Sequence, residues 1–448
     1  MKNYPELICL IAAYMSNTLV HADVLQVPSV YPTIQNAIDA AADGDEVHVS
    51  AGTYNESVNL LGKAIQLVGI DGAATTTIDA TGLGGSTVVC NTNETFKSVI
   101  SGFTITGGTG TLHPVWEMYH GGGVYVYLAS PTIFDCVITG NQAEFAGGMW
   151  AQEYFSLISN VSFTNNQSTF LEFGGAGGLY LWDSSATVND CVFENNHSTG
   201  PGGAVRTKII NDTSGHSVFQ NCSFNSNSSD EFGGAVVTFN STPTFNQCSF
   251  TNNESLDFAG ALYIGGSIGE DEQVTLTECN FEMNISGTYG GAVRIAHTTV
   301  SFDNCDFSSN SAPIYGGAIA VTGVDGPANC SLSGSSIKNN NSAQGGAIYN
   351  LDSVISNLDS TVICDNGSDP IVGDWNDLGG NTLAVSCDFP CLGDINADGV
   401  INKDDLTILI ENFGSCSTGD SCFSDINDDG QVDIEDLLLI LRHWGSCD

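Results

Sequence analysis

Two twelve-residue segments near the C-terminus place oxygen-bearing residues at the spacing of a calcium-binding loop. Oxygen side chains stand at positions 1, 3, 5, 9 and 12, a glycine (Gly399 or Gly430) at position 6, and a backbone carbonyl is offered at position 7. The predicted ligands are Asp394, Asn396, Asp398, Val400, Asn402 and Asp405 in the first loop, and Asp425, Asn427, Asp429, Gln431, Asp433 and Asp436 in the second. Calcium takes several hard oxygens on a flexible loop, so the pair predicts two Ca²⁺ ions.

Each loop must be positioned by the helix expected after it. Apolar residues that predict these helices are Leu406, Ile408, Leu409, Ile410 and Phe413, then Leu437 to Leu441 and Trp444. Position 12 is Asp rather than Glu, and no helix of normal length precedes the first loop, which departs from ordinary EF-hands. Residues 388–448 therefore resemble a type I dockerin, a small α-helical, EF-hand-like domain.

The resemblance to dockerins implies a partner. Dockerins bind cohesin domains and so attach secreted proteins to scaffolds or surfaces. Positions 10 and 11, which contact the cohesin and are small hydroxyl residues in many dockerins, are Lys403-Asp404 and Ile434-Glu435 here. The expected partner is therefore a cohesin-like or another surface docking protein.

Cysteines fall into two groups. Cys391, Cys416, Cys422 and Cys447 follow the duplication, which predicts two disulfides in an exported module. Pairing within each copy, Cys391 with Cys416 and Cys422 with Cys447, is the first choice, and cross-pairing stays open. Cys364 and Cys387 are expected to staple the last coil of the preceding domain. The ladder Cys191, Cys222, Cys248, Cys279 and Cys305 is expected to be buried free thiols.

That ladder belongs to a repeat that fills the chain before the calcium loops. A Cys-x-Phe motif recurs in steps of 31 and 26 residues, with an Asn three residues after each Phe, and is followed by Gly-Gly-Ala and an aliphatic residue. Cys and Phe two apart lie on one face of a strand, and the Asn is expected to be a left-handed turn residue. Each repeat is then one coil of a parallel β-helix, whose Phe, Cys and Asn form ladders. An amphipathic helix from Tyr31 to Ala41 is expected to cap the first coil.

Two known patterns share these residues. The segment Ala41 to Tyr54 resembles the start of pectin-lyase-like right-handed β-helices, and the Phe-x-x-Asn and Gly-Gly-Ala pair is similar to the polymorphic outer membrane protein repeat. The expected fold is an all-β, right-handed parallel β-helix followed by the dockerin-like domain. Expected boundaries are a signal peptide at 1–22, the β-helix at 23–387 and the dockerin-like domain at 388–448, so we expect a secreted, extracellular or cell-surface protein.

The net charge of the chain argues against one class of partner, nucleic acids. The chain holds 9 Lys and Arg against 51 Asp and Glu, a formal net charge of −42. Such a chain repels phosphate backbones, which argues against nucleic-acid binding. After the signal, no stretch is apolar enough to predict a membrane span.

Two functional hypotheses remain. Acidic-aromatic pairs and later tyrosines precede the glycines of several coils and could form a strip that binds a polysaccharide or calcium: Glu144, Phe145, Glu172, Phe173, Glu231, Phe232, Asp257, Phe258, Tyr289 and Tyr315. The alternative is that the rings fill corners of the coils and the acids beside them are solvated. The favoured function is a carbohydrate- or surface-binding component attached through the calcium module. The alternative is a polysaccharide lyase or glycoside hydrolase of pectin-lyase-like fold, for which Arg206-Thr207-Lys208 resembles a substrate-binding motif of polygalacturonases. No catalytic residue is predicted, because clustered aspartates on neighbouring coils are missing.

Overall fold

The chain folds into two compact units, one ending at Leu383 and the other beginning at Ala384. The computed structural model describes residues 22–170, 174–210, 216–266, 273–323, 328–351, 354–367, 369–384, 387, 393–396, 400–415, 424–427, 431–442 and 444–446. The expected signal peptide lies outside these residues. Within them, no helix is long and apolar enough to cross a membrane.

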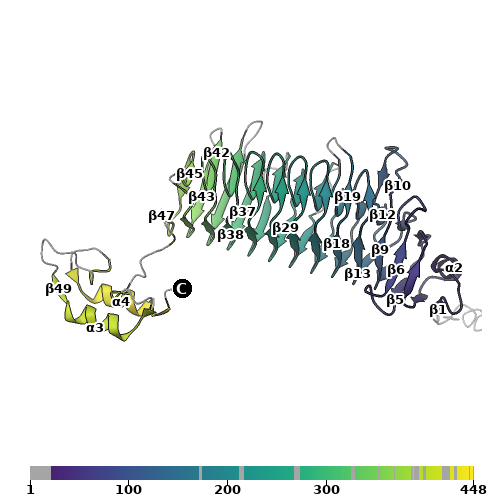
Figure 1. Cartoon of the computed structure of the whole chain (residues 1–448), viewed down its shortest axis with the longest axis horizontal. Coiled ribbons are helices and arrows are strands. Elements are labelled where there is room, and N and C mark those ends of the chain that lie inside the picture. The colour runs from purple at the N-terminus through teal and green to yellow at the C-terminus, as the bar shows by residue number, and fades with distance from the viewer. Residues whose placement is uncertain are drawn as a thin grey trace, which may run out of the picture. The chain divides into compact units, whose positions relative to one another are not determined.

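The first unit is the right-handed parallel β-helix that the sequence predicts (Figure 1). One coil runs through β21 (Thr187–Asn189), β22 (Val192–Glu194), β23 (His197–Ser198) and β24 (Val205–Lys208). Each strand pairs in parallel with its equivalent in the next coil, so that four stacked sheets form, which we call sheets 1 to 4.

Sheet 1 comprises β1 (Val24–Val27), β2 (Glu46–Val49), β5 (Gln66–Gly69), β8 (Val99–Ser101), β13 (Thr132–Phe134), β17 (Leu157–Ser159), β21, β25 (Val218–Gln220), β29 (Thr244–Asn246), β33 (Val274–Thr277), β37 (Thr299–Asp303), β40 (Asn329–Ser333), β43 (Ser356–Asp359) and β46 (Trp375–Asp377). Sheet 2 comprises β3 (Gly52–Tyr54), β6 (Thr76–Asp79), β9 (Thr104–Thr106), β14 (Val137–Thr139), β18 (Ser162–Thr164), β22, β26 (Ser223–Asn225), β30 (Ser249–Thr251), β34 (Asn280–Glu282), β38 (Asp306–Ser308), β41 (Ser336–Lys338), β44 (Val362–Cys364) and β47 (Thr382–Ala384).

Sheet 3 comprises β4 (Val58–Asn59), β7 (Val88–Cys90), β12 (Val124–Tyr127), β16 (Met149–Gln152), β20 (Leu179–Trp182), β24, β28 (Val236–Phe239), β32 (Leu262–Gly265), β36 (Val293–Ala296), β39 (Ile319–Thr322), β42 (Ile348–Leu351) and β45 (Ile371–Val372). Sheet 4 comprises β15 (Gln142–Ala143), β19 (Gln167–Ser168), β23, β27 (Ser228–Ser229), β31 (Glu254–Ser255) and β35 (Ile285–Ser286). One antiparallel hairpin, β10 (Thr111–Leu112) with β11 (Tyr119–His120), interrupts the coils.

The core is a set of ladders, because equivalent inward residues repeat in every coil. Phe193, Phe224 and Phe250 stack with ring centroids 4.9 and 4.7 Å apart. The predicted thiol ladder is buried and free of disulfides. Burial raises the pKa of the Cys136 thiol to about 12, which keeps it protonated and apolar.

The Asn of each repeat has another role than the sequence suggested. Asn253 is buried, its Nδ2 donates to the Phe224 carbonyl (3.0 Å) and to Asn284 Oδ1 (3.0 Å), and its Oδ1 accepts from Asn227. The left-handed residue is the preceding one, Asn252, with φ of 55°. The predicted left-handed turn was therefore wrong by one residue: the turn exposes Asn252 and directs Asn253 inward.

Helix α2 (Ile34–Ala40) begins after the N-cap Thr33, whose side chain accepts from the Asn36 amide. Its buried residues Ile34, Ala37 and Ile38 join the core at the β1 end of the stack (Figure 1). The predicted amphipathic helix is thus confirmed.

The second unit contains β48 (Val400–Ile401), α3 (Lys403–Glu411), β49 (Gly414–Ser415), β50 (Gln431–Val432), α4 (Ile434–Arg442) and β51 (Gly445–Ser446). Strands of the two copies pair with each other: β48 pairs with β51 and β49 with β50, both antiparallel. Ile401, Leu409, Val432 and Ile440 form its small buried core. The two helices predicted after the loops are present.

Candidate functional site

The first calcium loop is organised around the carboxylate of Asp405, which is fully buried. Asp405 Oδ1 accepts from the backbone N–H of Ile395 (2.8 Å) and Asn396 (3.2 Å), and Oδ2 accepts from the Asn402 N–H (2.9 Å). Asn402 also caps α3, since its side chain accepts from the Asp404 N–H. The Asp405 carboxylate thus links the first residues of the loop to Asn402, the residue before α3.

The second loop repeats this geometry around Asp436, also fully buried. Its Oδ1 accepts from the N–H groups of Ile426 (2.7 Å) and Asn427 (3.1 Å), and its Oδ2 from that of Asp433 (2.8 Å). The predicted ligands Asp398 and Asp429 lie outside the described residues. The donors that remain are carboxylate, amide and carbonyl oxygens, a set that suits Ca²⁺ rather than a softer ion.

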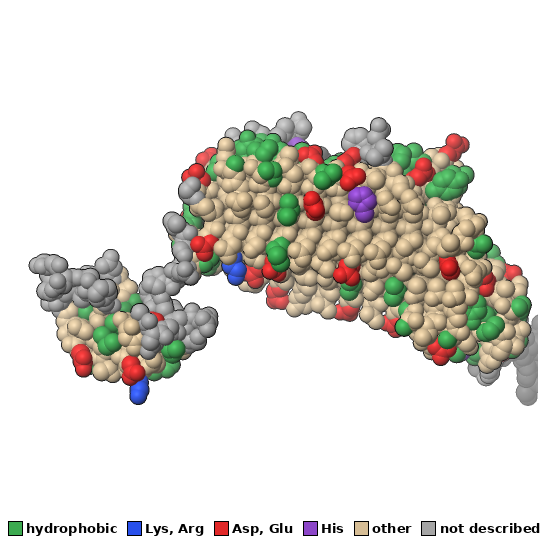
Figure 2. Space-filling model, viewed as in Figure 1, with side chains coloured by type: hydrophobic (Ala, Val, Ile, Leu, Met, Phe, Trp, Pro, Cys, Tyr) green, Lys and Arg blue, Asp and Glu red, His purple; other side chains and the backbone are tan. Residues whose placement is uncertain are grey.

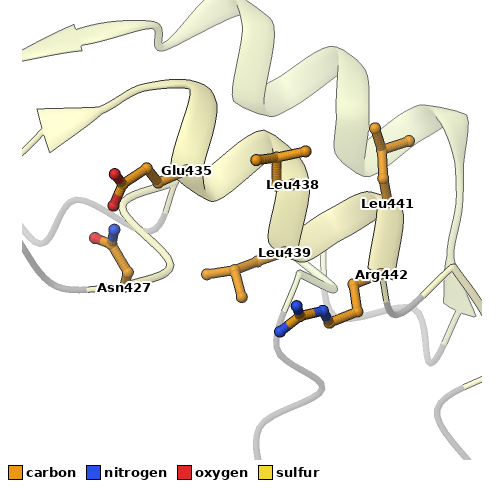
Figure 3. A pocket seen from close by; sticks show the side chains of 6 residues that line it. All are labelled: Asn427, Glu435, Leu438, Leu439, Leu441 and Arg442. Carbon is orange, nitrogen blue, oxygen red and sulfur yellow. The ribbon is translucent and has the colours of Figure 1, made fainter.

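The outer face of the second unit differs between the two copies. On α4, Ile434, Leu438 and Leu441 are 63%, 59% and 52% exposed and follow one helical stripe. The equivalent stripe of α3 carries Lys403 and Thr407 at the positions of Ile434 and Leu438, and it is apolar only at Ile410, which stands at the position of Leu441 and is 58% exposed. Figure 3 shows Leu438 and Leu441 on α4 beside a hollow lined by Asn427, Glu435, Leu438, Leu439, Leu441 and Arg442.

In the β-helix, the predicted ligand strip is brought into register over its later coils. Bridges join Phe232 to Phe258, Phe258 to Tyr289, and Tyr289 to Tyr315. Ring centroids are 5.3 Å apart for Phe258 and Tyr289 and 5.0 Å for Tyr289 and Tyr315. All four rings are partly exposed, so they form one row along the corner that precedes sheet 3.

A cation lies within this row. The Arg294 Cζ is 3.9 Å from the Phe258 ring centroid and 5.2 Å from that of Tyr289. Burial lowers the pKa of Arg294, while burial raises the pKa of Asp257 against the opposing effects of Thr288 and Arg294. Asp257 Oδ1 accepts from the Thr288 hydroxyl at 3.1 Å.

The earlier part of the strip is different. Glu172 and Phe173 lie outside the described residues, and the register of Met149 with Leu179 puts Gly175 level with Phe145. Phe145 stacks instead on Phe170, at 4.8 Å. Glu144 is held by the Tyr119 N–H, which donates to its carboxylate at 2.6 Å.

Sequence reasoning missed a second aromatic group on the outer face of sheet 3. Tyr125, Trp150 and Tyr180 stand in register on β12, β16 and β20 and form a cluster of their own outside the main core. The signal was present, because each is the second residue after a Gly-Gly pair.

Basic side chains gather on the same sheet. Of the six Lys and Arg between residues 23 and 387, Arg206, Lys208 and Arg294 point outward from sheet 3. Lys208 Nζ lies 4.6 Å from the Trp182 ring centroid. On the face drawn in Figure 2, acidic side chains are scattered and basic ones are few. Each of the three outward cations of sheet 3 thus lies beside an aromatic ring.

The predicted disulfides are only partly within the described residues. Cys364, at the end of β44, and Cys387 are each disulfide-bonded. Cys391, Cys416, Cys422 and Cys447 lie outside the described residues, and their pairing stays a prediction.

Two family models match the chain. The model described as the right handed beta helix region matches residues 86–281, and that of the dockerin type I domain matches residues 392–445. The chain thus carries a right-handed β-helix region and a C-terminal type I dockerin domain. No curated protein sequence matches it.

A solved structure shares the fold. The catalytic unit of a thermostable GH87 α-1,3-glucanase from Streptomyces thermodiastaticus strain HF3-3 is similar over 82% of this chain and 68% of that chain, with a TM-score of 0.51 and 14% identity. At this identity the likeness concerns the fold alone.

Proposed function

We propose that this chain, with its right-handed β-helix and type I dockerin domain, is an exported polysaccharide-binding protein held in an extracellular assembly by its dockerin. The single observation that carries the binding role is the row Phe232, Phe258, Tyr289 and Tyr315, with Arg294 inserted in it. Aromatic faces at regular spacing suit the apolar faces of successive sugar rings, because one coil adds about 4.8 Å.

The attachment role rests on the dockerin domain. Two loops with matching carboxylate geometry would each hold one Ca²⁺, with Asp405 and Asp436 fixing the loop backbone. The apolar stripe of α4 is the surface that would meet a cohesin-type domain, since the equivalent stripe of α3 is more polar. Secretion follows from the partner class and from the expected signal at residues 1–22.

Affinity electrophoresis of the whole chain in gels containing xylan, α-1,3-glucan or polygalacturonate tests the binding role. Tyr289→Ala and Tyr315→Ala should each weaken binding about tenfold, equivalent to about 1.4 kcal/mol. Phe155→Ala is the matched control, because Phe155 is 53% exposed and lies outside the strip. Unchanged retardation in both strip variants would refute the strip as the binding surface.

One observation supports hydrolysis as a second candidate. The Asp257 N–H donates to the Glu231 carbonyl, so these two acidic residues stand on adjacent coils beside the aromatic row. Burial raises the pKa of Asp257, as a general acid requires. A reducing-sugar assay with the wild type and Asp257→Asn tests it; release of sugar that the substitution abolishes supports catalysis.

A further inference from the structure

The second aromatic cluster lies on the outer face of sheet 3, which does not pack into the interior of the β-helix. Tyr125, Trp150 and Tyr180 are 1%, 0% and 0% exposed, although the inward positions of their strands are filled by other residues. Three of the five tryptophans of the chain, Trp116, Trp150 and Trp182, meet here. We call the three buried rings the floor.

The hairpin of β10 and β11 covers the floor. Its Trp116 ring lies 5.8 Å from that of Trp150 and 4.7 Å from that of Trp182. His113 stacks on Trp116 at 4.2 Å and contacts the Gln152 side chain at 3.2 Å. Trp116, Trp182 and Tyr127 are only partly buried and form a rim open to solvent.

Glycines stand at both feet of this hairpin. Gly110 has φ of 92° and Gly121 has φ of 60°, backbone conformations that other residues adopt rarely. The first glycine of later coils has the same conformation, with φ of 67° at Gly233 and 66° at Gly290, so Gly121 belongs to the regular corner of the coil. Gly110 is the glycine that is special to the hairpin.

The floor carries polar atoms without partners. Tyr125 OH, Trp150 Nε1, Tyr180 OH and His120 Nε2 are buried and make no hydrogen bond within the described part of the chain. A buried phenol elsewhere in the β-helix is paired: the Tyr154 OH lies 2.9 Å from the carbonyls of both Pro131 and Leu157, which share its one proton. Other unpaired buried atoms, such as Thr238 Oγ1 and Ser286 Oγ, are scattered over the coils, whereas these four belong to side chains of one aromatic cluster, where a ligand could pair them.

Their chemistry indicates what the occupant offers. His120 Nδ1 donates to the Met118 carbonyl at 2.9 Å, and burial lowers the pKa of His120 to about 3, so its Nε2 is an acceptor. Trp150 Nε1 is a donor only, and each phenol can donate or accept. An inorganic anion would satisfy the donors but not Nε2, and a metal ion would satisfy Nε2 but not the Trp150 N–H. A hydroxyl-bearing ligand satisfies all of them.

We propose that the floor, the rim and the hairpin of β10 and β11 form a second binding site, which takes a sugar ring of a polysaccharide. The hairpin lifts, the ring stacks between Trp116 and Trp182, and its hydroxyls bond to the unpaired polar atoms of the floor. The Lys208 ammonium over the Trp182 ring can meet a carboxylate where the sugar is a uronate. The inference rests on the proposed polysaccharide-binding function and locates a further part of it.

Removing one unpaired polar atom at a time shows whether the cluster binds a ligand or only stabilises the fold. Tyr180→Phe and Tyr125→Phe should leave the thermal midpoint unchanged or raise it, because each removes one unpaired hydroxyl and keeps the ring. The same substitutions should weaken sugar binding about three- to tenfold, the effect of one lost hydrogen bond. Tyr154→Phe is the control, since losing its paired hydroxyl should lower the midpoint and leave binding unchanged.

Binding is read from the cluster itself. In a Trp375→Phe, Trp444→Phe background the only tryptophans are Trp116, Trp150 and Trp182, so fluorescence reports this site. Short oligosaccharides of xylan, α-1,3-glucan and polygalacturonate are the probes. At least one should change the fluorescence saturably, and Trp116→Ala in this background should weaken that response about tenfold or more.

The outcomes are distinguishable from failure of the proposed function. If gels containing polysaccharide retard the protein through Tyr289 and Tyr315 but no probe alters the cluster fluorescence, this inference is overturned and the proposed function stands. If nothing on the panel binds, both are overturned. A midpoint that falls equally in Tyr180→Phe and Tyr154→Phe identifies the cluster as an outer core and overturns the inference.

Discussion

Replacing Asn253 by Ala should destabilise the β-helix far more than replacing its sequence neighbour Asn252 by Gly. The Asn253 side chain makes four hydrogen bonds in the buried ladder. Nδ2 donates to the Phe224 carbonyl and Asn284 Oδ1, and Oδ1 accepts from the backbone N–H (3.0 Å) and Nδ2 (3.1 Å) of Asn227. Alanine keeps none of them.

The magnitude follows from that count. Each neutral hydrogen bond contributes about 1 kcal/mol net, so the substitution should cost about 4 kcal/mol. The Asn227 N–H would remain buried without its acceptor, which adds about 1–3 kcal/mol. Asn252 is exposed at φ of 55°, where glycine is equally at ease, so Asn252→Gly should change the free energy of unfolding by less than about 0.5 kcal/mol.

Urea unfolding of the full chain, followed by near-ultraviolet circular dichroism with Ca²⁺ held constant, measures both variants. A loss below about 1 kcal/mol for Asn253→Ala, or equal losses at both positions, would refute the reasoning that the ladder is a strong buried network.

An added charge gives a second readout of the same site. In Asn253→Asp, burial would raise the folded-state pKa of the new carboxyl above its unfolded value. Stability is then greatest below the unfolded pKa and is lost as pH rises through the folded pKa. A variant that gains stability with rising pH would contradict this sign.

Three further predictions concern the dockerin and the cysteines. Leu438→Glu should weaken capture by a cohesin-type domain at least tenfold in surface plasmon resonance, whereas Thr407→Glu, the equivalent change on α3, should have little effect. Chelating Ca²⁺ should reduce the helical circular dichroism of the dockerin, since each bound ion contributes about 2.7 kcal/mol when free Ca²⁺ is 100-fold above Kd; an unchanged spectrum would contradict the calcium sites. Peptide mapping without reduction should recover Cys364 linked to Cys387, and free thiols at both would disprove the staple.

The fold was predictable because its inward residues are forced to repeat. Every coil must bury the same positions, so the same residue type recurs once per coil, as it does at Phe193, Phe224 and Phe250. This recurrence indicates a solenoid. The capping helix was readable from the apolar face of Ile34, Ala37 and Ile38. The role of the Asn was misread because asparagine favours left-handed turns as well as buried ladders, and only the backbone distinguishes Asn252 from Asn253.

The binding surfaces were harder to read from sequence. The pairs at Phe232 and Phe258 were visible because they precede a motif, and the structure does bring them into register. Glu172 and Phe173 look equivalent in sequence, but the strand register assigns that level to Gly175, since this coil has a longer corner. The aromatic cluster under the hairpin combines residues of β12, β16 and β20 with Trp116 of the hairpin. The hairpin is not part of the repeat, so no periodicity in the sequence relates Trp116 to Trp182.

Inward and outward positions of the coils obey different rules, and this explains where function can reside. An inward residue is fixed by the neighbours above and below it, so it cannot vary without a cavity or an unpaired group. An outward residue takes no part in the main core, so aromatic and basic side chains can accumulate there without disturbing it. Because successive coils are about 4.8 Å apart, any such accumulation becomes a linear array. A chain with 51 acidic residues nevertheless places Arg206, Lys208 and Arg294 beside rings on one sheet, which is the face where the proposed binding of an extended polymer would be concentrated.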